Sequence, residues 1–261
     1  MPARFLERDR VIVLGGVVGL TALGWLELWR RAGAMGVDAA MLRLMPWGLA
    51  DLGTAVLMWG VMMIAMMLPS ATPMLLLFSS VQRKRRQQGD PAMPTGLFAM
   101  GYLLIWIAWT LFAAGLQWML QALLLLSPHL ATTSALLGAA FLLLAGCYQL
   151  TPWKDACLAQ CQSPLGFLLT RWRKGPWGAR RMGLHHGAYC LGCCWALMGL
   201  LFVGGVMNLL WVAALAGFIL LEKVVAQGPW LSRVTGLGLI GWGLILVLGA
   251  APAGTFHIYS H

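Results

Sequence analysis

The sequence contains few charged residues: they make up 10% of its 261 positions, whereas 60% of the residues are hydrophobic. Soluble globular proteins carry roughly 25% charged residues and about 45–50% apolar ones. With a mean hydropathy of +0.79, the chain has too few polar side chains to cover a water-exposed surface. The composition therefore excludes a soluble enzyme, a nucleic-acid-binding protein and a disordered chain.

Several motifs that define enzymes and pumps are also missing. The sequence contains no phosphate-binding loop, no nucleophile elbow and no pair of neighbouring carboxylates. Acidic residues number only 8, and Glu27, Asp51 and Glu222 are the ones close to the apolar segments. We predict that the protein is not an enzyme, and the sequence excludes ATP-driven pumping by this chain alone.

Long apolar runs make up most of the chain. A transmembrane helix needs about 20 predominantly apolar residues, and the sequence offers seven such runs between turn-forming or charged residues. We predict an all-α polytopic membrane protein built as a bundle of about seven transmembrane helices, with six as the alternative count. The expected spans are residues 11–29, 52–79, 97–126, 134–151, 187–206, 209–226 and 234–251.

The organisation along the chain follows from these spans. The run from Val11 to Trp29 is too long for the core of a signal peptide, so a retained first helix is expected. Glycine and asparagine at residues 204–208 predict the turn between the fifth and sixth spans. We expect an N-terminal anchor helix and external loop over residues 1–51, a core with helices two to six over 52–226, and a last helix with an external tail over 227–261.

Lysine and arginine are distributed unevenly between the two sets of loops. One set holds 15 of the 18 basic residues and the other holds 3. Because cytoplasmic loops carry the excess of basic residues, we predict an N-terminus inside the cell and a C-terminus outside. The rich set is Arg4, Arg8, Arg10, Arg83, Lys84, Arg85, Arg86, Lys154, Arg171, Arg173, Lys174, Arg180, Arg181, Lys223 and Arg233, and the poor set is Arg30, Arg31 and Arg43.

The densest group of metal-binding residue types lies at the start of the fifth span. Residues three and four apart share one face of a helix, so a single stripe combines imidazole, thiol and thioether groups. Its members are His186, Cys190, Cys193 or Cys194, and Met198. Soft sulfur ligands select Cu(I), or zinc where thiolates predominate. Isolated buried cysteines act as small hydrophobes, but three within five residues beside two histidines favour a metal site. Disulfides are rare on the predicted cytoplasmic side.

The second span carries two adjoining Met-x-x-x-Met pairs within residues 62–67. Methionine commonly fills gaps in a core, but four methionines in six residues exceed that need. Pro69 and Pro73 follow, and irregular backbone at membrane depth must be buried in protein or line a cavity. We predict weak thioether contacts to a metal in the same half of the membrane as the cysteines. The methionines assigned to this role are Met62, Met66, Met67 and Met198.

Two further groups lie near the predicted cytoplasmic side. Cys157 and Cys161 are four residues apart in the loop after the fourth span, a spacing that suits one metal ion on a short helix or none. Glu222 and Lys223 predict a charge pair near the inner end of the sixth span. Such pairs are costly in a membrane and often functional, although a lysine there can also extend to the membrane surface.

The motif blocks resemble a bacterial family known as predicted metal-binding integral membrane proteins, a domain of unknown function in which some members are named copper chaperone. The resemblance covers roughly residues 50–226. Its matching blocks are residues 62–69, 148–164, 186–198, 205–208 and 222–223. The resemblance implies metal binding and a place in the bacterial cytoplasmic membrane.

We therefore predict an integral membrane protein that binds a soft transition metal for trafficking or delivery, with copper expected and zinc or nickel as alternatives. Its expected partners are the lipid bilayer and a metal-donor or metal-acceptor protein, not nucleic acid. One rival is a thiol–disulfide oxidoreductase, and another is a non-catalytic assembly subunit of a membrane complex. The complete set of predicted metal residues is His186, Cys190, Cys193, Cys194, Met198, Met62, Met66, Met67, Cys157 and Cys161.

Overall fold

The structure is a computed structural model that describes residues 2–42, 48–91, 94–127, 130–225 and 230–250. These residues form ten helices and no strand. The helices are α1 (Pro2–Leu42), α2 (Leu49–Gln87), α3 (Thr95–Ala122), α4 (Ala135–Gln149), α5 (Pro152–Gln162), α6 (Pro164–Arg171), α7 (Gly175–Gly199), α8 (Leu201–Gly204), α9 (Leu209–Val224) and α10 (Trp230–Ala250). The predicted all-α class is confirmed.

Five helical segments of the described chain are long and apolar enough to cross a membrane. They are Arg10–Gly33, Ala50–Gln87, Thr95–Ala122, Gly175–Gly204 and Trp230–Gly249. A sixth span results if α4 and α5, which meet at a bend of 68°, are counted as one. Helix α9 has 16 residues, fewer than the about 20 that a full span needs. The structure thus supports five or six spans, and the predicted count of seven is not confirmed.

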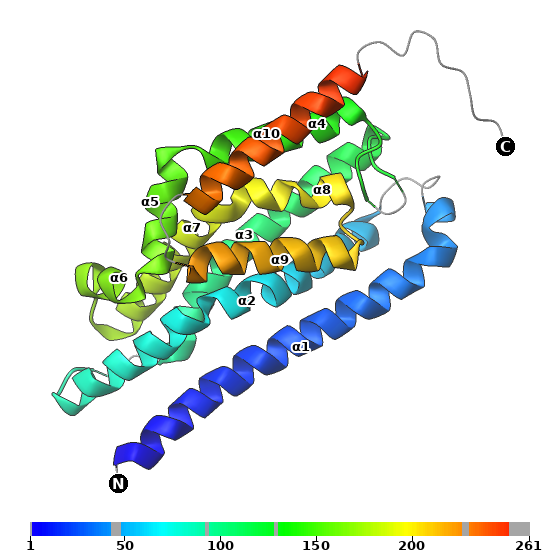
Figure 1. Cartoon of the computed structure of the whole chain (residues 1–261). Coiled ribbons are helices and arrows are strands. Elements are labelled where there is room, and N and C mark those ends of the chain that lie inside the picture. Colours follow the sequence, from blue (N-terminus) through cyan, green and yellow to red (C-terminus); the bar gives the residue numbers. More distant parts are fainter. Residues whose placement is uncertain (1, 43–47, 92–93, 128–129, 226–229, 251–261) are drawn as a thin grey trace.

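The long helices run back and forth along one direction (Figure 1). Helix α7 packs against α3 and α5, α4 packs against α10, and α2 lies between α1 and α3. The N-terminus, the α2–α3 turn and helix α6 lie at one end of the bundle, and the α8–α9 turn lies at the other (Figure 1). The loops predicted to be rich in basic residues therefore share one end. The assignment of that end to the cytoplasm stays a prediction.

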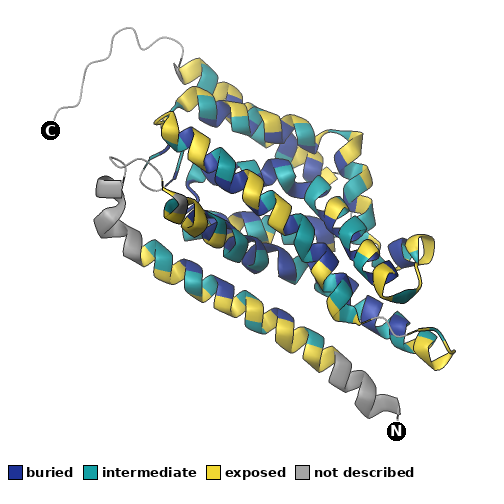
Figure 2. Ribbon diagram, turned by 180° about the vertical axis from the view of Figure 1, so that it is seen from behind, coloured by how far each residue is buried: buried dark blue, intermediate teal, exposed yellow. Residues whose placement is uncertain are grey.

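The outer helices present apolar side chains to their surroundings. Helix α1 shows exposed residues along most of its described length (Figure 2). Leu23, Trp29, Leu237 and Leu248 on α1 and α10 are each more than 60% exposed. Exposed leucine on this scale suits a lipid environment, since soluble monomers rarely expose large contiguous apolar patches.

Two glycines bring the backbones of α3 and α7 into direct contact. A Cβ atom at Gly101 would lie 2.1 Å from the Arg180 carbonyl oxygen, and one at Gly183 would lie 2.0 Å from the Phe98 carbonyl oxygen. Small residues permit such close approach between helices in membranes. The contact fixes the position of α7, the helix that carries three of the cysteines.

The structure confirms two local predictions and corrects two others. The turn predicted at residues 204–208 is present: Gly205 has φ of 90°, and the Asn208 side chain caps α9. The short helix proposed for the loop after the fourth span is α5, capped by Thr151. The irregularity expected at Pro69 and Pro73 is absent, because α2 continues through both residues. The fifth span begins earlier than predicted, since residues 175–186 extend α7 despite their arginines.

Candidate metal centre

Cys190 lies at the centre of a buried polar cluster on α7. Its side chain is 2% exposed, and its Sγ lies 3.0 Å from the Lys223 Nζ of α9. The Tyr102 hydroxyl of α3 is 3.3 Å from the same sulfur. Thiolates rather than thiols bind metals, and an ammonium group is a suitable counter-charge for a thiolate. Three helices thus meet at a single sulfur atom.

The remaining thiols of the centre come from α7 and α5. The Cys193 and Cys194 thiols donate hydrogen bonds to the Cys190 carbonyl oxygen at 3.1 and 3.0 Å. Helix α5 packs against α7, and this packing makes the Cys161 side chain a close neighbour of Cys190 and Cys193. The structure therefore joins Cys161, which the sequence placed in a separate loop, to the main group. We call Cys161, Cys190, Cys193 and Cys194 the thiol cluster.

Cys157 lies beside this cluster. Its side chain is half-buried, and a Cβ atom at Gly192 of α7 would lie 2.8 Å from the Cys157 Sγ. The Tyr148 hydroxyl donates to the Gly192 carbonyl oxygen at 2.5 Å. Because Gly192 has no side chain, α5 can approach α7 closely at this level. In the described chain, Cys157 packs against the backbone of α7 without a hydrogen bond to the other thiols.

Helix α2 contributes a thioether and a hydroxyl. The Lys223 Nζ donates to the Ser70 Oγ at 3.1 Å and lies 3.9 Å from the Met67 Sδ. The Tyr102 hydroxyl also donates to the Met67 carbonyl oxygen at 3.0 Å. Met67 is therefore the predicted methionine that the described contacts place at the centre.

The other predicted methionines lie in the apolar core. Met62, Met66 and Met198 are each no more than 2% exposed. In the described part of the chain, no hydrogen bond links their sulfur atoms to the thiol cluster. Their assignment as ligands stays a prediction.

His186 is enclosed by aromatic rings next to the cluster. It is 3% exposed, and its ring centre lies 5.8 Å from that of Tyr102 and 5.5 Å from that of Phe167. Its buried Nδ1 atom has no hydrogen-bond partner among the described residues. A buried nitrogen without a partner is costly, so this atom is available to a ligand. His185 differs, because its Nδ1 lies 2.7 Å from the Arg181 carbonyl oxygen.

The predicted pair between Glu222 and Lys223 is wrong. The Glu222 Oε1 instead accepts from the Lys154 Nζ at 2.6 Å, and the Ser232 hydroxyl donates to the same oxygen at 3.0 Å. Gln149 is hydrogen-bonded to both members of this ion pair. Successive residues on a helix point about 100° apart, so Glu222 and Lys223 face different neighbours. Lys154, which the sequence placed among the loop charges, is fully buried.

The buried charges near the cluster are unequal. Among the buried residues that the structure describes, Lys154 and Lys223 are two cations and Glu222 is the single carboxylate. An unpaired buried charge is costly. The thiol cluster contacts Lys223 and is the neighbouring group that can carry the balancing negative charge. A cysteine thiolate that is paired with an ammonium group suits the capture of a soft cation.

Two contacts of the centre were missed by sequence analysis. Tyr102 stands in an otherwise apolar run, and a buried tyrosine hydroxyl generally requires a partner, so its position was a usable signal. Ser70 gave no such signal. No group of three or more His, Cys, Asp or Glu side chains in the described chain is already arranged around one metal position. Binding would therefore require the thiols to rotate and Lys223 to move.

Fold and site together define an apolar helical bundle with a buried thiol cluster that faces a lysine. The chain belongs to the PpoB2 family, which is described as a copper chaperone and whose family model matches residues 56–246. This match includes every predicted metal residue and confirms the family resemblance drawn from the sequence. No curated protein and no solved structure matches the chain.

Proposed function

We propose that this protein is a copper-handling protein of the bacterial cytoplasmic membrane, which holds Cu(I) as cargo and delivers it to a partner protein. The observation that carries the proposal is the buried Cys190 sulfur 3.0 Å from the Lys223 Nζ, with the Cys193 thiol bonded to the Cys190 carbonyl oxygen and Cys161 of α5 packed beside them. Soft thiolates favour Cu(I), and the family description supports copper as the metal. The role is binding and transfer of a metal ion rather than catalysis.

The ligands have different tasks in this proposal. Cys190 and Cys193 supply the first thiolates from α7, and Cys161 supplies a third from α5. Met67 adds a weak thioether contact that favours exchange, and the Nδ1 atom of His186 adds a nitrogen. Because α5 and α7 each contribute a thiol, a bound ion would link the two helices.

Lys223 balances the charge of the centre before metal enters. Its ammonium lies 3.0 Å from the Cys190 Sγ and 3.9 Å from the Met67 Sδ, between two proposed ligands. Cu(I) carries the same single positive charge as the ammonium. It can therefore replace the ammonium between these two sulfur atoms without changing the charge there. The Ser70 hydroxyl, 3.1 Å from the Nζ, remains as a partner for the displaced ammonium.

The position of the cluster along α7 suits a protected cargo site. Cys190 lies nine residues beyond Arg181, which is about 14 Å along the helix axis at 1.5 Å per residue. The apolar core of a bilayer is about 30 Å thick. If Arg181 lies at the cytoplasmic surface, the thiols lie well inside the membrane.

Copper binding can be tested with a matched pair of cysteine variants. Cys190→Ser removes the central thiol, whereas Cys147→Ser removes an exposed thiol of α4 that lies outside the cluster. The purified proteins are loaded with Cu(I) without oxygen, and bound copper is measured by elemental analysis. We expect wild type and Cys147→Ser to retain copper and Cys190→Ser to lose most of it. Equal copper in all three proteins would overturn the proposal.

A thiol–disulfide oxidoreductase is the second candidate, because the packing of α5 against α7 makes Cys161 and Cys193 neighbours on two helices. An oxidoreductase of this kind would form a Cys161–Cys193 disulfide under mild oxidation and return to the dithiol on reduction. Mass spectrometry after oxidation separates the two functions. Under the copper proposal, prior loading with Cu(I) prevents the disulfide. A disulfide that forms equally fast with Cu(I) present favours the oxidoreductase.

A further inference from the structure

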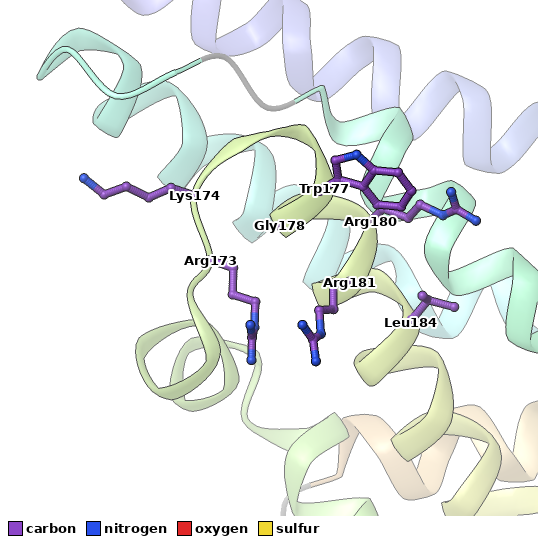
Figure 3. A pocket seen from close by; sticks show the side chains of 7 residues that line it. All are labelled: Arg173, Lys174, Trp177, Gly178, Arg180, Arg181 and Leu184. Atoms are coloured by element: carbon purple, nitrogen blue, oxygen red, sulfur yellow. The ribbon is translucent and has the colours of Figure 1, made fainter.

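A basic cavity lies at the start of α7, away from the thiol cluster. Its volume is about 630 Å³, and four of its seven lining residues carry a positive charge: Arg173, Lys174, Arg180 and Arg181. None of the described residues that line it is acidic. Figure 3 shows Arg173 and Arg181 extending to the same side of the helix start. A cavity with this charge suits an anionic ligand.

The cations of the cavity are only partly neutralised by the protein. Lys174 lies 2.9 Å from Asp90, and this hydrogen bond lowers the pKa of the Asp90 carboxyl from its ordinary value. The Arg180 guanidinium lies 5.0 Å from the centre of the Trp177 ring. Its buried Nε atom has no hydrogen-bond partner among the described residues. The arginines therefore retain unused donors, and Arg180 is held in place by the indole.

An apolar groove adjoins the cavity. Its volume is about 220 Å³, and it shares Trp177 and Arg180 with the basic cavity. Its other lining residues are Leu97, Met100 and Pro176. Trp177 is 77% exposed, and tryptophan is enriched where the apolar core of a membrane meets water. The paired cavity and groove match a molecule with an anionic head and an apolar tail.

We propose that this cavity and groove bind an anionic phospholipid, with the phosphate head between Arg173 and Arg181 and an acyl chain along Trp177, Leu97 and Met100. The inference rests on the membrane location in the proposed function but not on copper binding. Basic pockets at the cytoplasmic ends of transmembrane helices are suited to anionic headgroups. The lipid would hold the start of α7 at the membrane surface.

The test compares two double variants that remove the same charge. Arg173→Gln/Arg181→Gln changes the cavity, and Lys84→Gln/Arg86→Gln changes exposed residues of α2 outside it. Phosphatidylglycerol and phosphatidylcholine binding to the full-length protein in detergent is measured by native mass spectrometry. We expect wild type to prefer phosphatidylglycerol, and the cavity variant to bind it roughly tenfold or more weakly. The α2 variant should keep most of the affinity.

Four results would overturn the inference, and three of them come from the lipid-binding measurements. They are equal losses in the two variants, equal binding of the two lipids, and displacement of phosphatidylglycerol by inorganic phosphate alone. Retention of an acidic protein at the cavity in place of lipid would also overturn it. Copper content, measured on the same cavity variant, should equal that of wild type. A wild type that shows no lipid preference but binds copper normally contradicts this inference alone, whereas a wild type that prefers phosphatidylglycerol but binds no copper contradicts the proposed function alone.

Discussion

The buried ion pair between Lys154 and Glu222 allows a quantitative test of the packing behind the centre. The Lys154 Nζ lies 2.6 Å from the Glu222 Oε1, and both side chains are at most 2% exposed. Lys154→Met keeps a long unbranched side chain but leaves the carboxylate with Gln149 and Ser232 as partners. Removing one member of a buried ion pair costs about 3–5 kcal/mol. We therefore expect Lys154→Met to reduce the free energy of unfolding by about 3–5 kcal/mol.

Two companion variants make this result interpretable. Lys154→Met/Glu222→Leu leaves no unpaired charge of the pair, so most of the lost stability should return. Lys174→Met is the matched control, because the lysine of its ion pair with Asp90 is 67% exposed and ion pairs at the surface contribute little. Unfolding is followed by denaturant titration in detergent micelles. A Lys154→Met protein as stable as wild type, or no more affected than Lys174→Met, would refute the reasoning.

Three further predictions concern the centre and the helix contact that supports it. His186→Ala should weaken Cu(I) binding in a competitive chelator titration more than His185→Ala does, because the buried Nδ1 of His186 is the one without a partner; the opposite order would contradict its role. Met67→Leu should weaken Cu(I) binding while costing less than about 1.5 kcal/mol of stability. Met62→Leu should weaken binding less, because the described contacts join the Met67 sulfur to the centre, and equal effects would return Met67 to the role of core filler. Gly101→Ala should lower the unfolding temperature and copper content together, because its Cβ would lie 2.1 Å from a backbone oxygen of α7; an unchanged unfolding temperature would count against the close α3–α7 contact.

Much of the fold follows from the hydrophobic pattern. Each predicted span overlaps a helix in the structure, and the turn before α9 lies where Gly205 and Asn208 predicted it. The hydrophobic pattern predicted the number of membrane spans less well. A hydropathy pattern does not show that the chain bends by 68° between α4 and α5, because the bend depends on how α5 packs against α7. Nor does it show that α9 ends after 16 residues.

The candidate centre was predicted in part. The spacing of His186, Cys190 and Cys193 on one helix face is a local property, and the structure buries all three residues. The position of Cys161 beside the α7 cysteines depends on the packing of α5 against α7, and no local sequence pattern encodes this packing. The predicted pairing of Glu222 with Lys223 was wrong for the same reason. Adjacency in sequence does not determine which helices surround each side chain.

The central claim is that thiolates from α5 and α7 hold one copper ion together. Copper X-ray absorption spectroscopy of the Cu(I)-loaded protein tests it directly, because it reports the oxidation state and the kind and number of atoms around the metal. We predict Cu(I) with mainly sulfur neighbours, and fewer sulfur neighbours in both Cys161→Ser and Cys190→Ser than in wild type. A copper environment of oxygen and nitrogen alone, or a sulfur environment unchanged in both variants, would contradict the account.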